Sequence, residues 1–96
     1  MKVKDIKPGV EDIYLTAKVV TLGNTRTVDT RYGSADVAIA IVEDETGRLD
    51  FKLWRDQIRK VRVGDTIKVE NAFAVLFDGK TELNVGSRGR ISVVQR

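Results

Sequence analysis

The amino-acid sequence predicts an all-β protein folded as a small barrel, and three observations support this prediction. Apolar and polar residues alternate in several separate runs, which is the pattern of strands with one buried face. Turn signals separate these runs, and Asp78-Gly79 is the strongest hairpin signal in the chain. Only one short segment, beginning at Asp56, has the residues of a helical turn. At 96 residues, the chain is expected to form one domain, residues 1–96, around one hydrophobic core.

The first two predicted strands lie in the N-terminal half. Pro8-Gly9 breaks the opening segment, and the alternation that follows predicts a strand from about Asp12 to Leu22. Gly23-Asn24 is a turn signal, and polar residues 25–33 are expected to continue the strand and then form the first long loop. Alternating apolar residues next predict a second strand that ends in an acidic turn, residues 43–47.

A third strand follows that turn at once and leads into the short helix. Leu49, Phe51 and Leu53 share one face of this strand, whereas Trp54 falls on the opposite, charged face. Asp56 is placed to cap the helical turn that comes next. The sequence therefore predicts a single short helix after the third strand.

The C-terminal third predicts two more strands and an edge segment. Thr66–Phe77 is expected to be a long fourth strand, Lys80–Val85 the fifth, and residues 91–94 a short edge segment. Five strands with one helix between the third and fourth is the order of an OB-fold, a five-stranded Greek-key barrel. A β-sandwich and an SH3-like barrel are the alternatives, and the helix argues against both.

Phe73 and Phe77 pose a problem of side-chain direction within the fourth strand. They share their parity with Ile67, Val69 and Val75, so a straight strand would bury all five side chains in the core. A β-bulge near Glu70-Asn71 would reverse the parity and turn both phenylalanines outward. Alternation alone leaves both possibilities open.

Composition excludes much of the usual catalytic chemistry. The chain has no histidine and no cysteine, and so lacks the commonest general base, thiolate nucleophiles and the commonest transition-metal ligands. We therefore expect no enzyme, no cofactor and no metal site. The acidic turn at residues 43–45 offers hard oxygen ligands for a divalent cation, but it lacks the calcium-loop spacing and a solvated turn is favoured.

Charge and hydropathy indicate the class of partner. Residues 1–50 carry 7 basic and 9 acidic side chains, whereas residues 51–96 carry 10 and 5. A basic half suits a polyanionic partner, although surplus basic residues also serve solubility. No apolar run has the length of a membrane span or the form of a signal peptide. We expect no membrane partner and an intracellular, cytoplasmic and nucleoid-associated location.

Trp54 is the first candidate for a binding role. A large flat ring on a charged strand face invites a stacking partner, and the alternative is that it packs beneath the short helix. Asn84 is placed on the outward face of the fifth strand, where its amide would bind a base edge or stabilise its own strand. The candidates for phosphate or base contacts are Arg26, Thr30, Arg31, Lys52, Arg55 and Lys80.

Five short runs, taken together, resemble the archaeal single-stranded DNA-binding proteins. These are similar in turn to the OB domains of replication protein A and to the simple eukaryotic sensor single-stranded DNA-binding proteins. The runs are Val42-Glu43-Asp44-Glu45-Thr46-Gly47-Arg48, Leu53-Trp54, Val63-Gly64-Asp65, Val69-Glu70-Asn71-Ala72-Phe73 and Glu82-Leu83-Asn84-Val85-Gly86. The resemblance covers nearly the whole chain, from Val3 to Ile91, and it is specific as a set although no single run is.

The resemblance implies a site. In that family, bases stack on a tryptophan at the end of strand three and on two aromatic residues of strand four, roles that fall here on Trp54, Phe73 and Phe77. The first long loop adds basic and polar contacts, which implies Arg26, Thr30 and Arg31. This resemblance favours outward phenylalanines, a choice that periodicity does not make.

Two departures from the family pattern bear on the function. Relatives often have tryptophan at the position of Phe73, so stacking there is expected to be weaker. Simple archaeal members often carry a flexible tail, whereas this sequence ends at Arg96, so we expect either a minimal binder or one OB domain of a replication protein A subunit.

The leading hypothesis is non-catalytic binding and protection of single-stranded DNA in replication, recombination or repair. Other replication protein A subunits or repair proteins are further candidate partners. One alternative is an OB domain that binds single-stranded RNA or tRNA, because a stacking platform does not exclude a 2′-hydroxyl. Another is a structural OB module for subunit assembly, in which the three aromatic residues would form an interface or part of the core.

Overall fold

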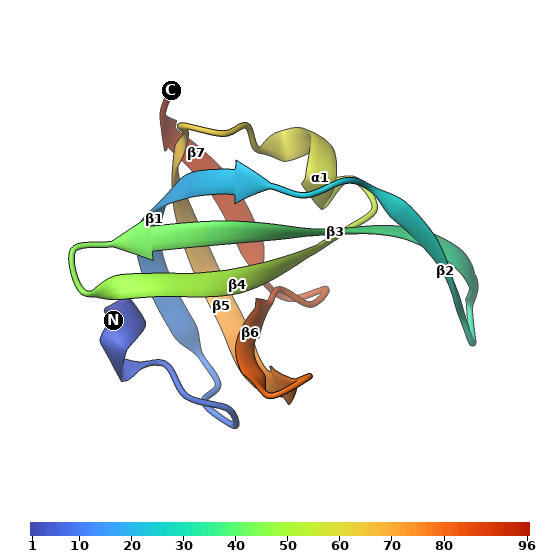
Figure 1. Ribbon diagram of the computed structural model, residues 1–96, viewed down its shortest axis with the longest axis horizontal. Helices are drawn as coiled ribbons and strands as arrows, with labels where there is room; N and C mark the ends of the chain where they lie inside the picture. The colour runs from blue at the N-terminus through green and yellow to red at the C-terminus, as the bar shows by residue number, and fades with distance from the viewer.

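The structure, a computed structural model, describes residues 1–96 and consists mainly of β-strands (Figure 1). The elements in chain order are a 3-10 helix η1 (Val3–Asp5), β1 (Ile13–Leu22), β2 (Arg26–Thr30), β3 (Gly33–Asp44), β4 (Gly47–Trp54), α1 (Gln57–Lys60), β5 (Thr66–Phe77), β6 (Lys80–Asn84) and β7 (Arg90–Gln95). The single α-helix lies between β4 and β5, as predicted. No helix is long and apolar enough to cross a membrane.

Five strands close into a barrel. Hydrogen-bonded neighbours follow the order β1, β3, β4, β6 and β5, and β5 pairs with β1 to complete the ring. All of these pairings are antiparallel except that of β4 with β6, which is parallel. This confirms the predicted OB-fold barrel, with β1, β3, β4, β5 and β6 as its five strands. β2 and β7 are additional strands, which pair with β3 and β5 respectively.

β2 is the larger difference from the prediction, which expected strand continuation and a loop there. It forms a two-stranded hairpin with the start of β3, from Arg26 in register with Val37 to Thr30 in register with Gly33. We call residues 26–37 the hairpin arm, which extends away from the barrel at the right of Figure 1. Its polar side chains bond across the strands, as when Thr27 Oγ1 donates to an Asp36 carboxylate oxygen at 2.9 Å. Such residues give no apolar alternation, so periodicity did not mark β2.

The core lies inside the ring and follows from the alternation in the sequence. β1 alternates buried and exposed residues from Ile13 to Val19, and β4 alternates buried and half-buried residues from Leu49 to Leu53. The largest fully buried side chains include Phe51, which lies near the centre of β4. Burial of each such side chain contributes about 1.5–3 kcal/mol relative to exposure.

β5 contains the predicted bulge. Leu15 of β1 is in register with Val69, but Ile13, two residues earlier, is in register with Ala72, so three steps of β5 oppose two of β1. Asn71 lies in this segment with a positive φ of 53°. Ile67 and Val69 point inward before the bulge, whereas Ala72 and Ala74 point inward after it. The bulge therefore turns Phe73 and Phe77 outward, where 38% and 50% of their surfaces are exposed.

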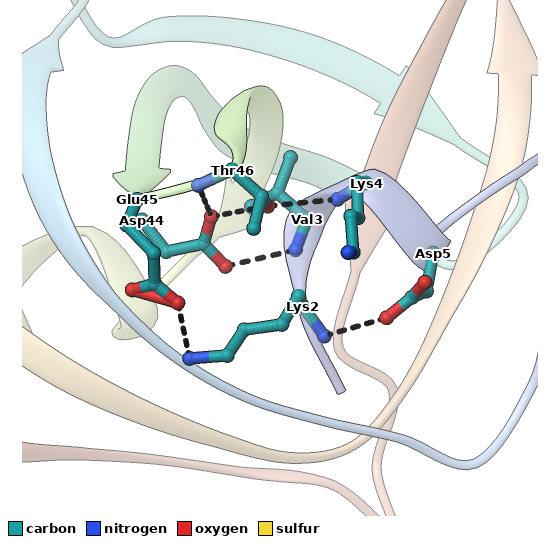
Figure 2. A network of polar contacts seen from close by, with 7 residues as sticks. All are labelled: Lys2, Val3, Lys4, Asp5, Asp44, Glu45 and Thr46. Atoms are coloured by element: carbon teal, nitrogen blue, oxygen red, sulfur yellow. Dashed lines mark hydrogen bonds and ion pairs between the residues drawn. The ribbon is translucent and has the colours of Figure 1, made fainter.

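The acidic turn between β3 and β4 holds the N-terminal segment against one end of the barrel (Figure 2). Val3 N–H donates to Asp44 Oδ2 at 2.8 Å, Lys4 N–H donates to Thr46 Oγ1 at 3.0 Å, and Lys2 forms an ion pair with Glu45. Thr46 also donates its N–H and hydroxyl to Asp44 Oδ1, at 2.7 and 2.6 Å. We call this set of contacts the N-terminal clasp, and it holds Val3 in the hydrophobic core.

The contacts of the N-terminal clasp also shift the pKa values of Lys2, Asp44 and Glu45. Burial pushes the pKa of Asp44 upward, but the hydrogen bonds from Thr46 and Val3 and the charge of Lys2 outweigh burial and lower the pKa. The hydrogen bond and charge of Glu45 raise the pKa of Lys2, and the same contact lowers the pKa of Glu45. The acidic residues therefore act here as charged partners of the N-terminal segment.

Candidate nucleic-acid interface

Strand register brings the aromatic candidates onto one outer face of the barrel. Lys52 on β4 is in register with Asn84 on β6, and Asn84 is in register with Phe73 on β5. Residues in register point to the same side of a sheet, and so do residues two apart on one strand. Trp54 therefore shares this face with Phe73, and so does Phe77, whose partner in register is Lys80. We call Trp54, Phe73 and Phe77 the aromatic platform.

A groove of about 560 Å³ lies beside Trp54 and Phe73 and is lined by both. The other lining residues are Arg55, Asp56, Gln57, Lys60, Asn84, Val85, Gly86 and Ser87. Trp54 is partly exposed, although it lies beside Gln57 and Lys60 of the short helix. A partly exposed indole beside an open groove is a suitable surface for a planar ligand group to stack on.

Gln57 of α1 fixes the main chain at Trp54. The Trp54 N–H donates to Gln57 Oε1 at 2.9 Å, and Gln57 Nε2 donates to the Val85 carbonyl at 3.1 Å. The short helix therefore ties the end of β4 to the segment that follows β6. This holds the tryptophan at a defined place on the rim of the groove.

Lys52 lies between two of the platform rings. Its Nζ is 5.1 Å from the centre of the Trp54 ring and 4.7 Å from the centre of the Phe77 ring, distances of cation–π contacts. The same atom is 3.9 Å from Glu82 Oε1, and only 15% of the Lys52 side chain is exposed. The residue predicted to contact phosphate or base is thus a largely covered cation with three partners inside the protein.

Asn84 is largely covered by its neighbours. It belongs to the outward face as expected, but only 8% of its surface is exposed. Its Oδ1 accepts a hydrogen bond from Trp54 Nε1 at 3.4 Å, and its Nδ2 donates to Glu82 Oε1 at 3.2 Å. These contacts agree with the alternative that the amide stabilises its own surroundings, and a base contact by Asn84 stays a prediction.

Two of the predicted basic residues lie on the hairpin arm. Arg26 is in register with Val37, which is in register with Trp54, so Arg26 shares the outer face with the platform. Arg31 is exposed in the turn at the tip of the arm. Thr30 is already occupied, because its hydroxyl donates to the Gly33 carbonyl at 2.7 Å and accepts from the Tyr32 N–H at 3.1 Å. We assign its hydroxyl to the turn of the arm.

Two further basic candidates lie at opposite ends of the platform. Arg55 directly follows Trp54 with a positive φ of 53° and lines the platform groove. It also lines a second groove of about 370 Å³ between the hairpin arm and α1, beside Arg59. Lys80 is exposed and in register with Phe77. Basic side chains therefore border the aromatic row at both ends.

Sequence reasoning missed several residues of this face, among them Gln57, which holds the main chain at Trp54. Lys60 and Ser87 line the platform groove, but one lies on a four-residue helix and the other in a Gly-containing loop, so no periodicity marked them. Glu82 shares the face of Asn84, two residues away on the same strand, yet only 4% of its surface is exposed. A carboxylate on a strand that pairs on both sides gives no sequence signal for burial.

Comparison with known proteins agrees with this geometry. The family model for "Single-stranded DNA binding protein Ssb-like, OB fold" matches residues 6–93. The single-stranded DNA binding protein Ssb of Saccharolobus solfataricus is 35% identical over 91 residues, which are 95% of this chain and 62% of that protein. Replication factor A of Methanothermobacter thermautotrophicus is 28% identical over 82 residues, 84% of this chain and 10% of that protein.

The fold is shared with solved structures as well. The solution structure of an OB domain from Thermoplasma acidophilum matches with a TM-score of 0.86 and 21% identity, covering 98% of this chain and 85% of that one. The chain spans less than two thirds of the length of either curated relative. Since the family model matches nearly the whole chain, the protein belongs to the Ssb-like family of OB-fold single-stranded DNA-binding proteins.

Proposed function

We propose that this chain binds single-stranded DNA without catalysis, by stacking bases on Trp54, Phe73 and Phe77. The observation that supports this most directly is the placement of all three rings, from two strands, on one outer face, with Trp54 and Phe73 lining an open groove. Stacking on an aromatic side chain contributes about 1–3 kcal/mol per base and tolerates any sequence. A platform of this kind suits a protein that covers exposed strands in replication, recombination or repair.

Phosphate contacts are proposed for the basic residues at the border of the platform. Arg26, Arg31, Arg55 and Lys80 are exposed, and none of them has a carboxylate partner within ion-pair distance. Each such contact releases counterions, so affinity is expected to fall as salt rises.

DNA is proposed as the ligand because a relative whose alignment covers 95% of this chain is named a single-stranded DNA binding protein. The match to a replication factor A further supports partners among replication protein A subunits. Binding to single-stranded DNA would bring the protein to the nucleoid, where single strands are exposed. We further propose that residues 1–96 act as one nucleic-acid-binding domain.

A titration of the intact protein with oligo-dT at two salt concentrations tests the proposal. The chain has one tryptophan, so its fluorescence reports on Trp54 alone. We expect quenching on binding and weaker affinity at the higher salt. A matched RNA oligomer that binds more tightly would indicate an RNA-binding domain, and unchanged fluorescence with no binding would favour a structural module.

The variant Trp54→Ala requires a second readout, because it removes the fluorophore. With fluorescence anisotropy of a labelled oligo-dT, we expect Trp54→Ala to weaken binding by about 1–3 kcal/mol. Tyr14→Ala is the matched control, since Tyr14 is also an exposed aromatic residue but lies on β1 and lines a groove with Lys68. Equal losses in the two variants would remove the platform from the binding site.

A further inference from the structure

Glu82 is a buried carboxylate on the face that we propose binds a polyanion. Only 6% of its side chain is exposed, and it belongs to β6, between the platform strands β4 and β5. Burying a charge is costly unless the charge is paired and hydrogen-bonded. A negative charge here also repels phosphate. We therefore look for the role of Glu82 in its contacts with other side chains of the protein.

Glu82 is the centre of a chain of contacts that reaches Trp54 and Phe77. Its Oε1 lies 3.9 Å from Lys52 Nζ and accepts from Asn84 Nδ2 at 3.2 Å. Lys52 Nζ in turn contacts the rings of Trp54 and Phe77, and Asn84 Oδ1 accepts from the Trp54 indole at 3.4 Å. One carboxylate oxygen of Glu82 thus contacts both the ammonium that lies near the two rings and the amide that accepts the indole hydrogen bond.

We propose that Glu82 and Lys52 are positioning residues that hold the aromatic platform in its binding geometry, and that Lys52 is not a phosphate ligand. This inference rests on the proposed function and deepens it. Glu82 keeps the Lys52 ammonium between the rings of Trp54 and Phe77 and orients the Asn84 amide toward the indole. Rings fixed before binding lose less conformational entropy when a base stacks on them.

The ion pair has a measurable consequence for salt dependence. For single strands, the slope of log affinity against log salt changes by about 0.7 for each phosphate that a basic residue neutralises. Lys52 already has Glu82 as its counter-charge, so it releases no counterion from DNA. Loss of Lys52 therefore weakens binding without changing the slope, which distinguishes a positioning cation from a phosphate contact.

The deciding experiment measures oligo-dT affinity over a salt series for the wild type, Lys52→Gln and the matched variant Lys80→Gln. We expect Lys52→Gln to weaken binding about two- to tenfold, the cost of ordering a side chain or two on binding, with an unchanged slope. Lys80→Gln, in contrast, flattens the slope by about 0.7. Equal flattening in Lys52→Gln overturns the proposal.

For Glu82→Gln, the positioning role and a purely electrostatic effect predict opposite changes in DNA affinity. Removing a negative charge from a DNA-binding face strengthens binding if charge alone matters, whereas we expect it to weaken binding about two- to tenfold. The double variant Lys52→Gln/Glu82→Gln should bind no more weakly than Glu82→Gln alone, because the two side chains act as one unit. Tighter binding by Glu82→Gln, or additive losses in the double variant, contradicts the inference.

Acrylamide quenching of Trp54 in the free protein tests the geometry without DNA. Acrylamide is uncharged, so its access to the indole reports packing. We expect a larger quenching constant in Lys52→Gln and in Glu82→Gln, restoration by Lys52→Arg, and no change in the control Lys68→Gln, an exposed lysine of β5. Should Glu82→Gln fail to fold, Lys52→Gln and Lys52→Arg decide the outcome.

These results separate the two proposals. A wild type that does not bind oligo-dT contradicts the proposed function, while the quenching constants still show whether Glu82 and Lys52 hold the indole. A wild type that binds, together with unchanged quenching in both variants, contradicts the positioning role alone.

Discussion

The main-chain carbonyl of Asn71 lies so close to Gly89 that a Cβ atom on Gly89 would be 2.9 Å from the oxygen. Asn71 is the residue of positive φ in the bulge of β5, and Gly89 belongs to the loop between β6 and β7. Asn71 Nδ2 also donates to the carbonyl of Arg88 at 3.5 Å. The loop therefore packs directly on the bulge that turns Phe73 and Phe77 outward.

Gly89→Ala should destabilise the protein by about 1–3 kcal/mol, the usual cost of overpacking. The added methyl would lie 2.6 Å from Val85 Cγ1 as well as 2.9 Å from two carbonyl oxygens, so the loop must move. Urea unfolding measures the loss. Gly86→Ala is the control, because its Cβ would meet Phe73 at an ordinary 3.6 Å, and an equal loss there would exclude a specific role of the close approach.

Asn71→Val should destabilise the protein by about 1–3 kcal/mol, since a β-branched residue is strained at a φ of 53°. Asn71→Gly is the matched variant, because glycine adopts this conformation without a steric penalty. Thermal unfolding compares the two. Equal unfolding temperatures for the valine and glycine variants would show that the left-handed conformation at Asn71 costs nothing.

Most of the barrel was predictable because strands with one buried face carry their own signal. Thr66–Phe77 was predicted with the boundaries that the structure has. The bulge near Glu70-Asn71 was one of two possibilities left open by alternation, and only the family resemblance favoured it. β2 was not predicted as a separate strand, because it covers no core and its cross-strand bonds join polar side chains. Local pattern thus predicts strands that pack on a core better than strands that do not.

The candidate site was predictable only in part, because burial on its outer face depends on strands far apart in the sequence. The outward direction of Asn84 followed from alternation, but its cover by Trp54 depends on the pairing of β4 with β6. The same pairing places Lys52 beside Glu82. A parallel pairing between strands of separate hairpins produces no pattern in the sequence of either strand. The contacts that cover Asn84 and pair Lys52 with Glu82 could therefore be found only in the structure.

Phe73→Trp should strengthen binding of single-stranded DNA. Phe73 is 38% exposed beside the platform groove, and a larger ring offers a base more stacking area. We expect a gain of up to about 1 kcal/mol, within the range of one stacked base. Oligo-dT anisotropy measures it, with Phe73→Ala as the opposite control. Weaker binding by the tryptophan variant would show that the space beside Gly86, where an added Cβ would lie 3.6 Å from the Phe73 ring, is limiting.

The N-terminal clasp should make stability depend on pH in the acidic range. The pKa of Asp44 is lowered in the folded state, because hydrogen bonds from Thr46 and Val3 outweigh the effect of burial. A carboxyl group with a lowered folded pKa stabilises the protein above its unfolded pKa, and this contribution is lost as pH falls through the folded value. We therefore expect stability to decrease below about pH 4.

Asp44→Asn separates this contribution from other acid effects. The substitution keeps the shape of the side chain but removes the charge, so it should cost about 1–3 kcal/mol at neutral pH, the range for hydrogen bonds to a charged group. Because the wild-type carboxylate becomes protonated in acid, the gap between wild type and variant should narrow as pH falls toward 3. Urea unfolding at each pH measures the gap, with Glu11→Gln, an exposed carboxylate outside the clasp, as the control. A gap that stays constant from neutral pH to acid would show that the hydrogen bonds to Asp44 do not depend on its charge.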